Sequence, residues 1–496
     1  MRTSGVLTRS AIFIASALLL AACGSTVPSG TTQARPVDAG LGTTDGSGPG
    51  SLTTTAGNPA VGRLPTAGAP LRPGSGGPTD TQGASPGGLP SAGVAGGATT
   101  GKVAPVKVGM IVVDDANEYL GGLGFSVDVG DQEQQSQAMA RWVNAHGGLG
   151  GAKLDLVLRH TKTADSTSRN TYQQSNCTDF TEDRPVQFVL DYNYYTGPFV
   201  PCLVQHGVAY INAGAQGPSD TLLRSHGPFI YEPGMVNYTR AARLMVNGLT
   251  DAAFLTGKSR IGYFRPDNSE FERAETAGLR PALAARGLKL TDAATLSSDA
   301  SQWGSTASSA VLKFKSQNID RVVFSGLGSI TFFAIAAEGQ DYHPRYGFTT
   351  DVNPIGTASL VPHQQLEGSA GVGWQPAEDV GYTHPGGKPG SSNDALCHQI
   401  MTDAGVNMTS DTVAFLAIDI CDAFLFLKFG LDKSGGSSIA QFAAAIAAHP
   451  SSYQSPLTFD VDMSGMHDGA HRYRLSRWDA ACPCFVYSSP QRAIPD

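Results

Sequence analysis

The chain has 496 residues, more than the roughly 100–200 residues of one domain, so more than one packing unit is expected. Its 42 acidic side chains exceed its 34 basic ones and no run of Lys and Arg occurs, which excludes the charge pattern of a nucleic-acid-binding protein. Hydrophobic residues make up 41% of the chain, which is enough for ordinary globular cores.

Residues 1–23 have the pattern of a secretory signal. Arg2 and Arg9 flank the start of an apolar run over residues 11–20, which is shorter than the ~20 residues of a membrane span. Cys23 ends a Leu-Ala-Ala-Cys motif that resembles a bacterial lipobox. The resemblance implies that Cys23 is lipidated and holds the exported chain at the outer face of the cell membrane. The alternative is a plain signal peptide whose cysteine is accidental.

Residues 24–105 are dominated by Gly, Ser, Thr, Pro and Ala, and no aromatic ring of Phe, Tyr or Trp occurs between Phe13 and Tyr119. Such a segment buries too little apolar surface to offset the entropy of ordering it, so we expect a disordered tether. As a flexible coil it spans roughly 50 Å. Residues 83–87 fit the G-x-S-x-G nucleophile motif, but the strand and helix that this motif requires are not expected here.

The next part of the chain alternates β-branched runs with helical patterns. Short apolar runs predict strands, and apolar stripes that end at Gly or polar residues predict helices. The expected strands are residues 106–113, 154–158, 186–190 and 209–212, with helices over residues 131–146 and 166–180. This alternation predicts a parallel sheet that is covered on both faces.

The same pattern then occurs a second time. Strands are expected at residues 260–264, 321–324 and 346–348, and helices at residues 270–286, 306–317 and 330–338. Two such units predict an α/β protein with two lobes. Because ligands of open parallel sheets lie outside the carboxyl ends of the strands, we expect a cleft between the lobes.

Several segments resemble type I solute-binding proteins of ABC importers, the branched-chain-amino-acid-binding proteins in particular. They are residues 106–113, 130–132, 143–151, 153–157, 455–460 and 473–475. The resemblance implies two Rossmann-like lobes with parallel sheets, joined by three hinge crossings near residues 231–237, 369–375 and 452–457. It also implies the composition of the lobes: residues 106–234 and 372–453 form lobe 1, and residues 235–371 and 454–496 form lobe 2.

The resemblance further implies the ligand-binding residues. The family holds its ligand with small hydroxyl residues after a strand of the first lobe and with an acid of the second lobe. Only Thr196 keeps a small hydroxyl here, so we expect a ligand that is bulkier or less zwitterionic than leucine. The implied ligand-binding residues are Asn193, Tyr194, Tyr195, Thr196, Ala213, Gly214, Ala215, Gln216, Asp351 and Trp374.

Each of these residues has a purely structural alternative. Tyr194 and Tyr195 also fit a role in packing against the following helix. Asp351 also fits a turn or a helix cap, where Asp is common. Trp374 also fits the apolar core of a hinge.

Other acidic and histidine residues do not predict a metal site. Residues 460–468 imitate a calcium loop, but His471 stands where a bidentate Glu is required, so a hairpin turn is expected. His467 and His471 lack further zinc ligands nearby. Asp419 and Asp422 share one face of a helix over residues 413–429, and we expect them at its rim. No metal or cofactor is expected.

Six cysteines remain after Cys23, and an exported chain permits disulfides. Cys177 and Cys202 flank the same expected strand, and Cys397 and Cys421 lie on consecutive expected helices. This leaves Cys482 and Cys484. A disulfide between them would close a small, strained ring, because only one residue separates them. A disulfide from Cys421 to one of these two cysteines is therefore an open alternative.

These observations lead to one functional hypothesis. The chain is expected to be a monomeric, lipid-anchored, extracytoplasmic binding protein and not an enzyme. It captures a small organic solute, such as an amino-acid-like compound, an amide or a small aromatic acid, for an ABC permease with its ATPase subunits. The alternatives are a receptor subunit of the same fold, a surface hydrolase, an adhesive module and a lipid or steroid carrier.

Overall fold

The computed structural model describes residues 104–122, 128–162, 169–191, 197–212, 214 and 217–495. These residues belong to one compact unit, residues 96–496. The expected signal sequence, the Cys23 motif and the expected tether lie outside the described residues. Among the helices that are described, none combines the length and the apolar character that a membrane crossing requires.

Lobe 1 is built on a five-stranded parallel sheet with the strand order β2-β1-β3-β4-β5. Six of the eight residues of β1 are buried, because helices cover both faces of the sheet. The strands are β1 Val106–Val113, β2 Leu154–Thr161, β3 Phe188–Asp191, β4 Ala209–Asn212 and β5 Ile230–Tyr231. The helices are α1 Ala116–Gly122, α2 Gln132–Ala145, α3 Arg169–Thr178, η2 Asp179–Asp183, α4 Phe199–Gln205, α5 Asp220–His226, α12 Ser392–Asp403, α13 Asp411–Ser434 and α14 Ile439–Ala448.

Lobe 2 repeats this order in β7-β6-β8-β9-β10, all parallel, and extends it with antiparallel β11 and β12. Its strands are β6 Ile261–Pro266, β7 Leu290–Leu296, β8 Arg321–Phe324, β9 Arg345–Thr349, β10 Ala370–Gly373, β11 Arg472–Asp479, β12 Cys484–Tyr487 and β13 Arg492–Ala493. Its helices are α6 Tyr238–Asp251, α7 Ser269–Arg273, η3 Ala274–Leu279, α8 Arg280–Ala285, η4 Ala300–Gln302, α9 Trp303–Ser316, α10 Ser329–Glu338, η5 Thr350–Val352, α11 Pro354–Leu360 and η6 His363–Leu366, followed by η7 Ala377–Gly381 at the return to lobe 1.

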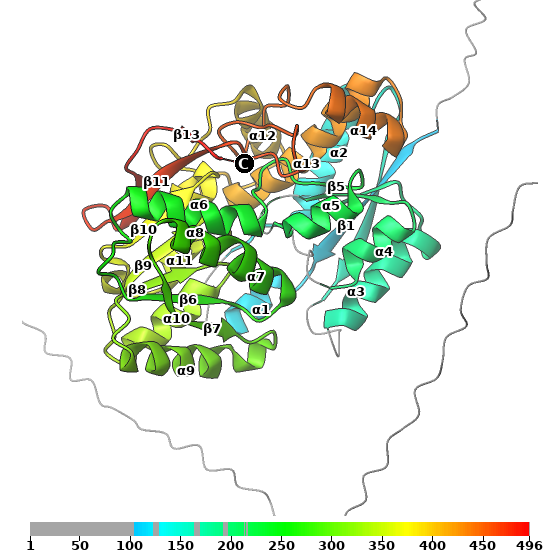
Figure 1. Cartoon of the computed structure of the whole chain (residues 1–496). Helices are drawn as coiled ribbons and strands as arrows, with labels where there is room; N and C mark the ends of the chain where they lie inside the picture. Colours follow the sequence, from blue (N-terminus) through cyan, green and yellow to red (C-terminus); the bar gives the residue numbers. More distant parts are fainter. Residues whose placement is uncertain are drawn as a thin grey trace, which may run out of the picture. The chain divides into compact units, whose positions relative to one another are not determined.

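The apolar cores lie on the two faces of each sheet. In lobe 2, Tyr263 packs with α6 and α8, whereas its neighbour Phe264 packs with α9 and α10, since successive strand residues point to opposite faces. Figure 1 shows α6 and α8 on one side of the lobe 2 strands and α9 and α10 on the other. The predicted α/β architecture with two parallel sheets is therefore confirmed.

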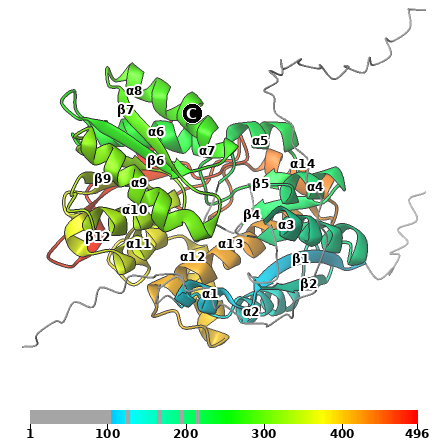
Figure 2. The same cartoon turned by 90° about the horizontal axis from the view of Figure 1, so that it is seen from below.

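Three crossings join the lobes, and hydrogen bonds tie the crossings to one another. Gln375 Nε2 in the second crossing donates to Gly234 O in the first at 2.7 Å. The amide N of Gly469 in the third crossing donates to Glu232 O in the first at 2.7 Å. Figure 2 shows the lobe 1 strands and the green lobe 2 strands as separate groups, with α13 between them.

Residues after the expected third crossing, 452–457, contact both lobes. Leu457, Val461 and Met463 still pack in the core of lobe 1, and Ala470 is the first residue after them in the core of lobe 2. Phe459, in contrast, contacts Tyr487 of lobe 2, with 5.7 Å between the ring centroids, so the assignment of residues 454–496 to lobe 2 stays a prediction. No apolar periodicity marks this loop, so the sequence offered no signal for its position.

The helix expected at residues 270–286 is divided into three segments. The α-helical α7 and α8 are separated by η3, a wider π-helical turn. Pro281 lies in the first turn of α8, and it has no N–H to donate to the preceding turn. The strands β7, β10 and β12 were not among the expected strands.

The structure has three disulfides. They join Cys177 to Cys202 and Cys397 to Cys421, as the spacing indicated, and Cys482 to Cys484. The first closes a loop between α3 and α4 of lobe 1, and the second joins α12 to α13. The exchange that the sequence left open, between Cys421 and the Cys482–Cys484 pair, does not occur in the structure.

Candidate functional site

The expected ligand-binding residues are described only in part. Asn193, Tyr194, Tyr195 and Thr196, which follow β3, lie outside the described residues, as do Ala213, Ala215 and Gln216, which follow β4. Gly214, Asp351 and Trp374 are described. The site is therefore built from these three residues and from the side chains around them.

Gly214 lies at the carboxyl end of β4 against a buried carboxylate. Its φ is +124°, and a Cβ at this position would lie 2.3 Å from Cγ of Asp419. Asp419 is 1% exposed and Asp422 is fully buried, so the expectation that both lie at the rim of α13 was wrong. All residues from Val413 to Leu427 are buried, so this helix has no exposed rim in that part.

Asp351 lies in η5, directly after β9 in lobe 2. One carboxylate oxygen accepts a hydrogen bond from the backbone N of Gly326 at 2.9 Å, and the other accepts one from Thr349 Oγ1. Asp351 therefore connects the loops that follow β8 and β9. Burial raises the pKa of Asp351 to about 6, and these hydrogen bonds act in the opposite direction.

Trp374 follows β10 at the second crossing and is fully buried in the apolar core of lobe 2. Its backbone N donates to Thr350 Oγ1 at 2.9 Å. Its indole Nε1 is buried and has no hydrogen-bond partner among the described residues. Trp374 thus packs as expected for the apolar core at a hinge, and its indole N–H makes no hydrogen bond to the described residues.

Two acidic residues in the second crossing were not among the expected site residues. Glu378 and Asp379 lie in η7, and each is 1% exposed. Asp379 accepts hydrogen bonds from Thr350 Oγ1 at 2.7 Å and from the Tyr487 hydroxyl at 2.6 Å. Burial raises the pKa of Asp379 to about 7. The sequence contains a signal for Glu378 and Asp379. They are two adjacent acids that follow a buried strand and the crossing after it.

Buried acids also occupy the other two crossings. Glu232 in the first crossing accepts a hydrogen bond from Asn212 Nδ2 at 2.9 Å. Asp468 in the third crossing accepts one from Asn237 Nδ2 at 2.8 Å and pairs with Arg240 at 3.2 Å. Burial, and then the nearby Asp468, raise the pKa of Glu232 well above its usual value.

The segment that imitates a calcium loop has other contacts. Asp460 pairs with Arg472 at 3.2 Å, and Asp462 accepts from the backbone N of Ser464 at 2.9 Å. His467 stacks on Tyr231, with 4.5 Å between the ring centroids. In the described part of the chain, no group of three or more His, Cys, Asp or Glu side chains is arranged to hold a metal ion.

Comparisons with solved structures identify the fold. A substrate-binding protein of an ABC transporter from Desulfitobacterium hafniense, solved in complex with Leu, is 14% identical and superposes with a TM-score of 0.53, covering 78% of this chain and 99% of that chain. A solute-binding protein from R. palustris in complex with 4-hydroxybenzoate is also 14% identical, with a TM-score of 0.57 and coverage of 79% and 98%. The chain has the type I periplasmic binding protein fold.

A third protein of this fold shows how wide its ligand range is. The fatty acid ABC transporter substrate-binding protein from Thermomonospora curvata is 13% identical, with a TM-score of 0.56 and coverage of 78% of this chain and 92% of that chain. Searches of the sequence against protein-family models and against curated proteins give no match. The type I periplasmic binding protein fold is thus shared with proteins for leucine, a hydroxybenzoate and a fatty acid.

Proposed function

We propose that the chain is an extracytoplasmic substrate-binding protein that captures a small organic solute between its two lobes and delivers it to an ABC permease with its ATPase subunits. The observation that carries this proposal is the repeated strand order. Both lobes have the same parallel order, 2-1-3-4-5, and three crossings join them. Ligands of such sheets lie at the carboxyl ends of the strands, where the strand order reverses.

The described residues at these strand ends fit a binding site better than a catalytic one. They include Gly214 after β4, Gly326 after β8 and Asp351 after β9, in addition to the second crossing. Among them are backbone groups and buried acids. Residues 192–196, which follow β3 in the sequence, contain three tyrosines. A non-enzymatic role also agrees with the neighbours of the same fold, which are binding proteins.

The proposal includes a lipid anchor and hinge motion. The Leu-Ala-Ala-Cys motif at Cys23 supports attachment to the outer face of the cell membrane by lipid. The crossings are short segments, which suit rigid rotation of one lobe against the other. The chain is proposed to act as a monomer, since one chain contains both lobes.

Ligand-induced closure tests the proposal. A ligand that binds only the folded, closed form adds about 2.7 kcal/mol of stability at one hundred times its Kd. For ~390 residues that unfold together, this raises Tm by roughly 3 °C. A screen of amino acids, amides, aromatic acids, sugars and amines is expected to give a hit, and X-ray scattering is expected to show a smaller radius of gyration with it. A confirmed ligand that leaves the scattering unchanged contradicts the proposal.

Variants at the expected site test which residues contact the ligand. Tyr194→Ala and Tyr195→Ala are expected to abolish the ligand-induced rise in Tm and to leave Tm without ligand nearly unchanged. For Asp351 the suitable variant is Asp351→Asn, because an alanine would leave the buried amide N of Gly326 without its acceptor.

A further inference from the structure

The two disulfides of lobe 1 are largely protected from solvent. Cys177, Cys397 and Cys421 are fully buried, and Cys202 is half-buried. The bond Cys177–Cys202 joins α3 to α4 and the bond Cys397–Cys421 joins α12 to α13, across sequence separations of 25 and 24 residues. A thiol in solution reaches such bonds poorly, and breaking either one releases two helices from each other. Both bonds therefore have the features of structural disulfides.

The disulfide between Cys482 and Cys484 has the opposite features. Cys482 is exposed in the turn of the β11–β12 hairpin, and Cys484, which begins β12, is 9% exposed. Only Pro483 lies between them, so the bond closes a loop within one hairpin and joins no separate elements. The stabilisation that a disulfide gives decreases as the loop that it closes becomes shorter. This bond is therefore expected to stabilise the fold least among the three.

Pro483, between the two cysteines, has an unfavourable backbone conformation. Its φ is +25°, whereas the pyrrolidine ring favours a φ of about −65°. Such a conformation persists only where the surrounding structure imposes it. Pro483 is exposed, so the constraint comes from the covalent ring that the two cysteines close around it and not from packing. Opening the disulfide is therefore expected to release this strain, and strained or exposed disulfides are the more easily reduced ones.

Other contacts hold the β11–β12 hairpin together. The ring of Phe485 in β12 packs on Trp478 in β11, with 5.1 Å between the ring centroids, and on Phe348 in β9, with 5.0 Å between them. At the turn, the backbone N of Ala481 donates to Asp479 Oδ1 at 3.1 Å. The strands also pair along their length by backbone hydrogen bonds. The hairpin is therefore expected to keep its structure when the disulfide is reduced.

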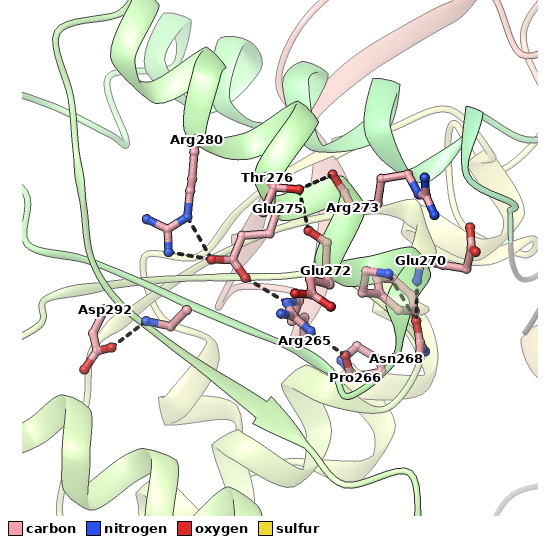
Figure 3. A network of polar contacts seen from close by, with 12 residues as sticks. Arg265, Pro266, Asn268, Glu270, Glu272, Arg273, Glu275, Thr276, Arg280 and Asp292 are labelled. Atoms are coloured by element: carbon pink, nitrogen blue, oxygen red, sulfur yellow. Dashed lines mark hydrogen bonds and ion pairs between the residues drawn. The ribbon is translucent and has the colours of Figure 1, made fainter. Parts of the chain in front are cut away.

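The rest of lobe 2 is also held together without a covalent link. Figure 3 shows one of its buried polar networks, in which Glu275 lies between two guanidinium groups. Arg265 at the end of β6 donates to one carboxylate oxygen at 2.8 Å, and Arg280 in α8 donates to the other at 2.6 Å. Charge-assisted hydrogen bonds of this kind are about twice as strong as neutral ones. Reduction of the hairpin disulfide leaves this network unchanged.

We propose that Cys482–Cys484 is a thiol–disulfide exchange site that oxidises thiols in solution, an activity that does not depend on the transport function proposed above. A thiolate attacks Sγ of the exposed Cys482, and the electron pair of the broken bond leaves on Sγ of Cys484. A second thiolate attacks the solution-derived sulfur of this mixed disulfide and releases the Cys482 thiolate. In sum, two thiols become one disulfide, and the cysteine pair takes up two electrons and two protons.

A redox titration of the folded wild-type protein tests the proposal. The protein is equilibrated with mixtures of reduced and oxidised glutathione, and alkylation after an acid quench followed by peptide mass spectrometry gives the reduced fraction of each pair. Cys482–Cys484 is expected to be half reduced at a ratio [GSH]²/[GSSG] roughly 100-fold or more below that of the two lobe 1 disulfides, which are the internal controls. Circular dichroism is expected to stay unchanged at that ratio. Reduction of this pair together with or after the lobe 1 pairs, or only with unfolding, overturns the proposal.

Variants test which sulfur is attacked and whether the bond is structural. In Cys484→Ser, the thiol of Cys482 is expected to form a mixed disulfide with oxidised glutathione roughly tenfold faster than the thiol of Cys484 does in Cys482→Ser, because Cys482 is the more exposed residue. Equal rates contradict the assignment of Cys482 as the attacked residue. The variant with both replacements is expected to fold and to keep the circular dichroism of the wild type. Failure of this variant to fold would mean that the bond is structural, and the exchange assignment would then be wrong.

Discussion

The Tyr487 hydroxyl donates a hydrogen bond of 2.6 Å to Asp379 Oδ2 and thereby connects β12 of lobe 2 to the second crossing. The other oxygen of Asp379 accepts from Thr350 Oγ1, so the carboxyl group holds two segments of lobe 2 against the crossing. Its pKa of about 7 places its ionisation within the physiological range. The hydrogen bonds at this crossing are therefore expected to change with pH.

The first prediction concerns stability and pH. Burial raises the pKa of Asp351 to about 6 and those of Asp379 and Asp422 to about 7, from 3.8 for an unperturbed Asp. The folded state thus binds these protons more tightly than the unfolded state. Each group therefore reduces the free energy of unfolding by about 1.4 kcal/mol per pH unit as pH rises from about 4 to its folded pKa. Denaturant unfolding at several pH values measures this slope.

Asp422→Asn isolates the contribution of one group. In this variant the free energy of unfolding is expected to fall less steeply with pH than in the wild type. The difference is about 1.4 kcal/mol per pH unit between pH 5 and 7. The wild-type slope alone does not isolate Asp422, because His467 also changes the pH dependence. Burial lowers the pKa of His467, so this residue makes the free energy of unfolding rise with pH below about pH 6.5. Asp341, whose side chain is 97% exposed, gives the control Asp341→Asn. Equal slopes for all three proteins contradict the assignment.

The second prediction concerns the disulfides. Cys177 and Cys202 close a loop of 25 residues, so replacing both by Ser is expected to lower the free energy of unfolding by about 3 kcal/mol. Cys482 and Cys484 are only two residues apart, so the same replacement there is expected to cost roughly half as much. Thiol labelling of the denatured, unreduced protein is expected to find no reactive cysteine. Two or more labelled thiols contradict the pairing.

The sequence predicted the sheets better than the site. Val106–Val113 is an uninterrupted apolar run, and such runs indicate strands that are buried on both faces, whatever the surrounding fold. The spacing of Cys177 and Cys202 likewise followed from the expected strand between them. These features depend on local patterns that are visible in one stretch of sequence.

The buried acids could not be predicted in the same way. Helical spacing places Asp419 and Asp422 on one face of α13, but it does not show which faces are covered by other elements. Asp419 is buried next to Gly214, and Asp422 is buried next to Tyr453, whose hydroxyl donates a hydrogen bond to it. Both contacts join segments that are distant in the sequence, so they follow only from the tertiary structure.

The third prediction concerns the lipid anchor. Cys23→Ser is expected to release the protein from membranes, because Cys23 is the proposed lipid attachment site. Membrane fractions washed with carbonate, compared for wild type and variant, measure this. A variant that stays with the washed membranes contradicts the lipoprotein assignment.

The last prediction uses the contact between Gly214 and Asp419. In Gly214→Ala the new Cβ would lie 2.3 Å from the Asp419 carboxyl carbon, at a φ of +124°, so the loop after β4 must move. The strained backbone alone is expected to cost roughly 1–3 kcal/mol. Gly147→Ala is the control, since its φ is +90° but nothing lies within 4 Å of the added Cβ.

A double variant separates the collision from the backbone strain. Because Asp419→Ala removes the carboxylate that meets the new Cβ, Gly214→Ala combined with Asp419→Ala is expected to lose less stability than the sum of the two single variants. The same pairing of Gly147→Ala with Asp419→Ala is expected to be additive within about 0.5 kcal/mol. Additive losses for both pairs would mean that Gly214 and Asp419 are not in contact in solution, and Asp419 would then lose its place next to the β4 loop.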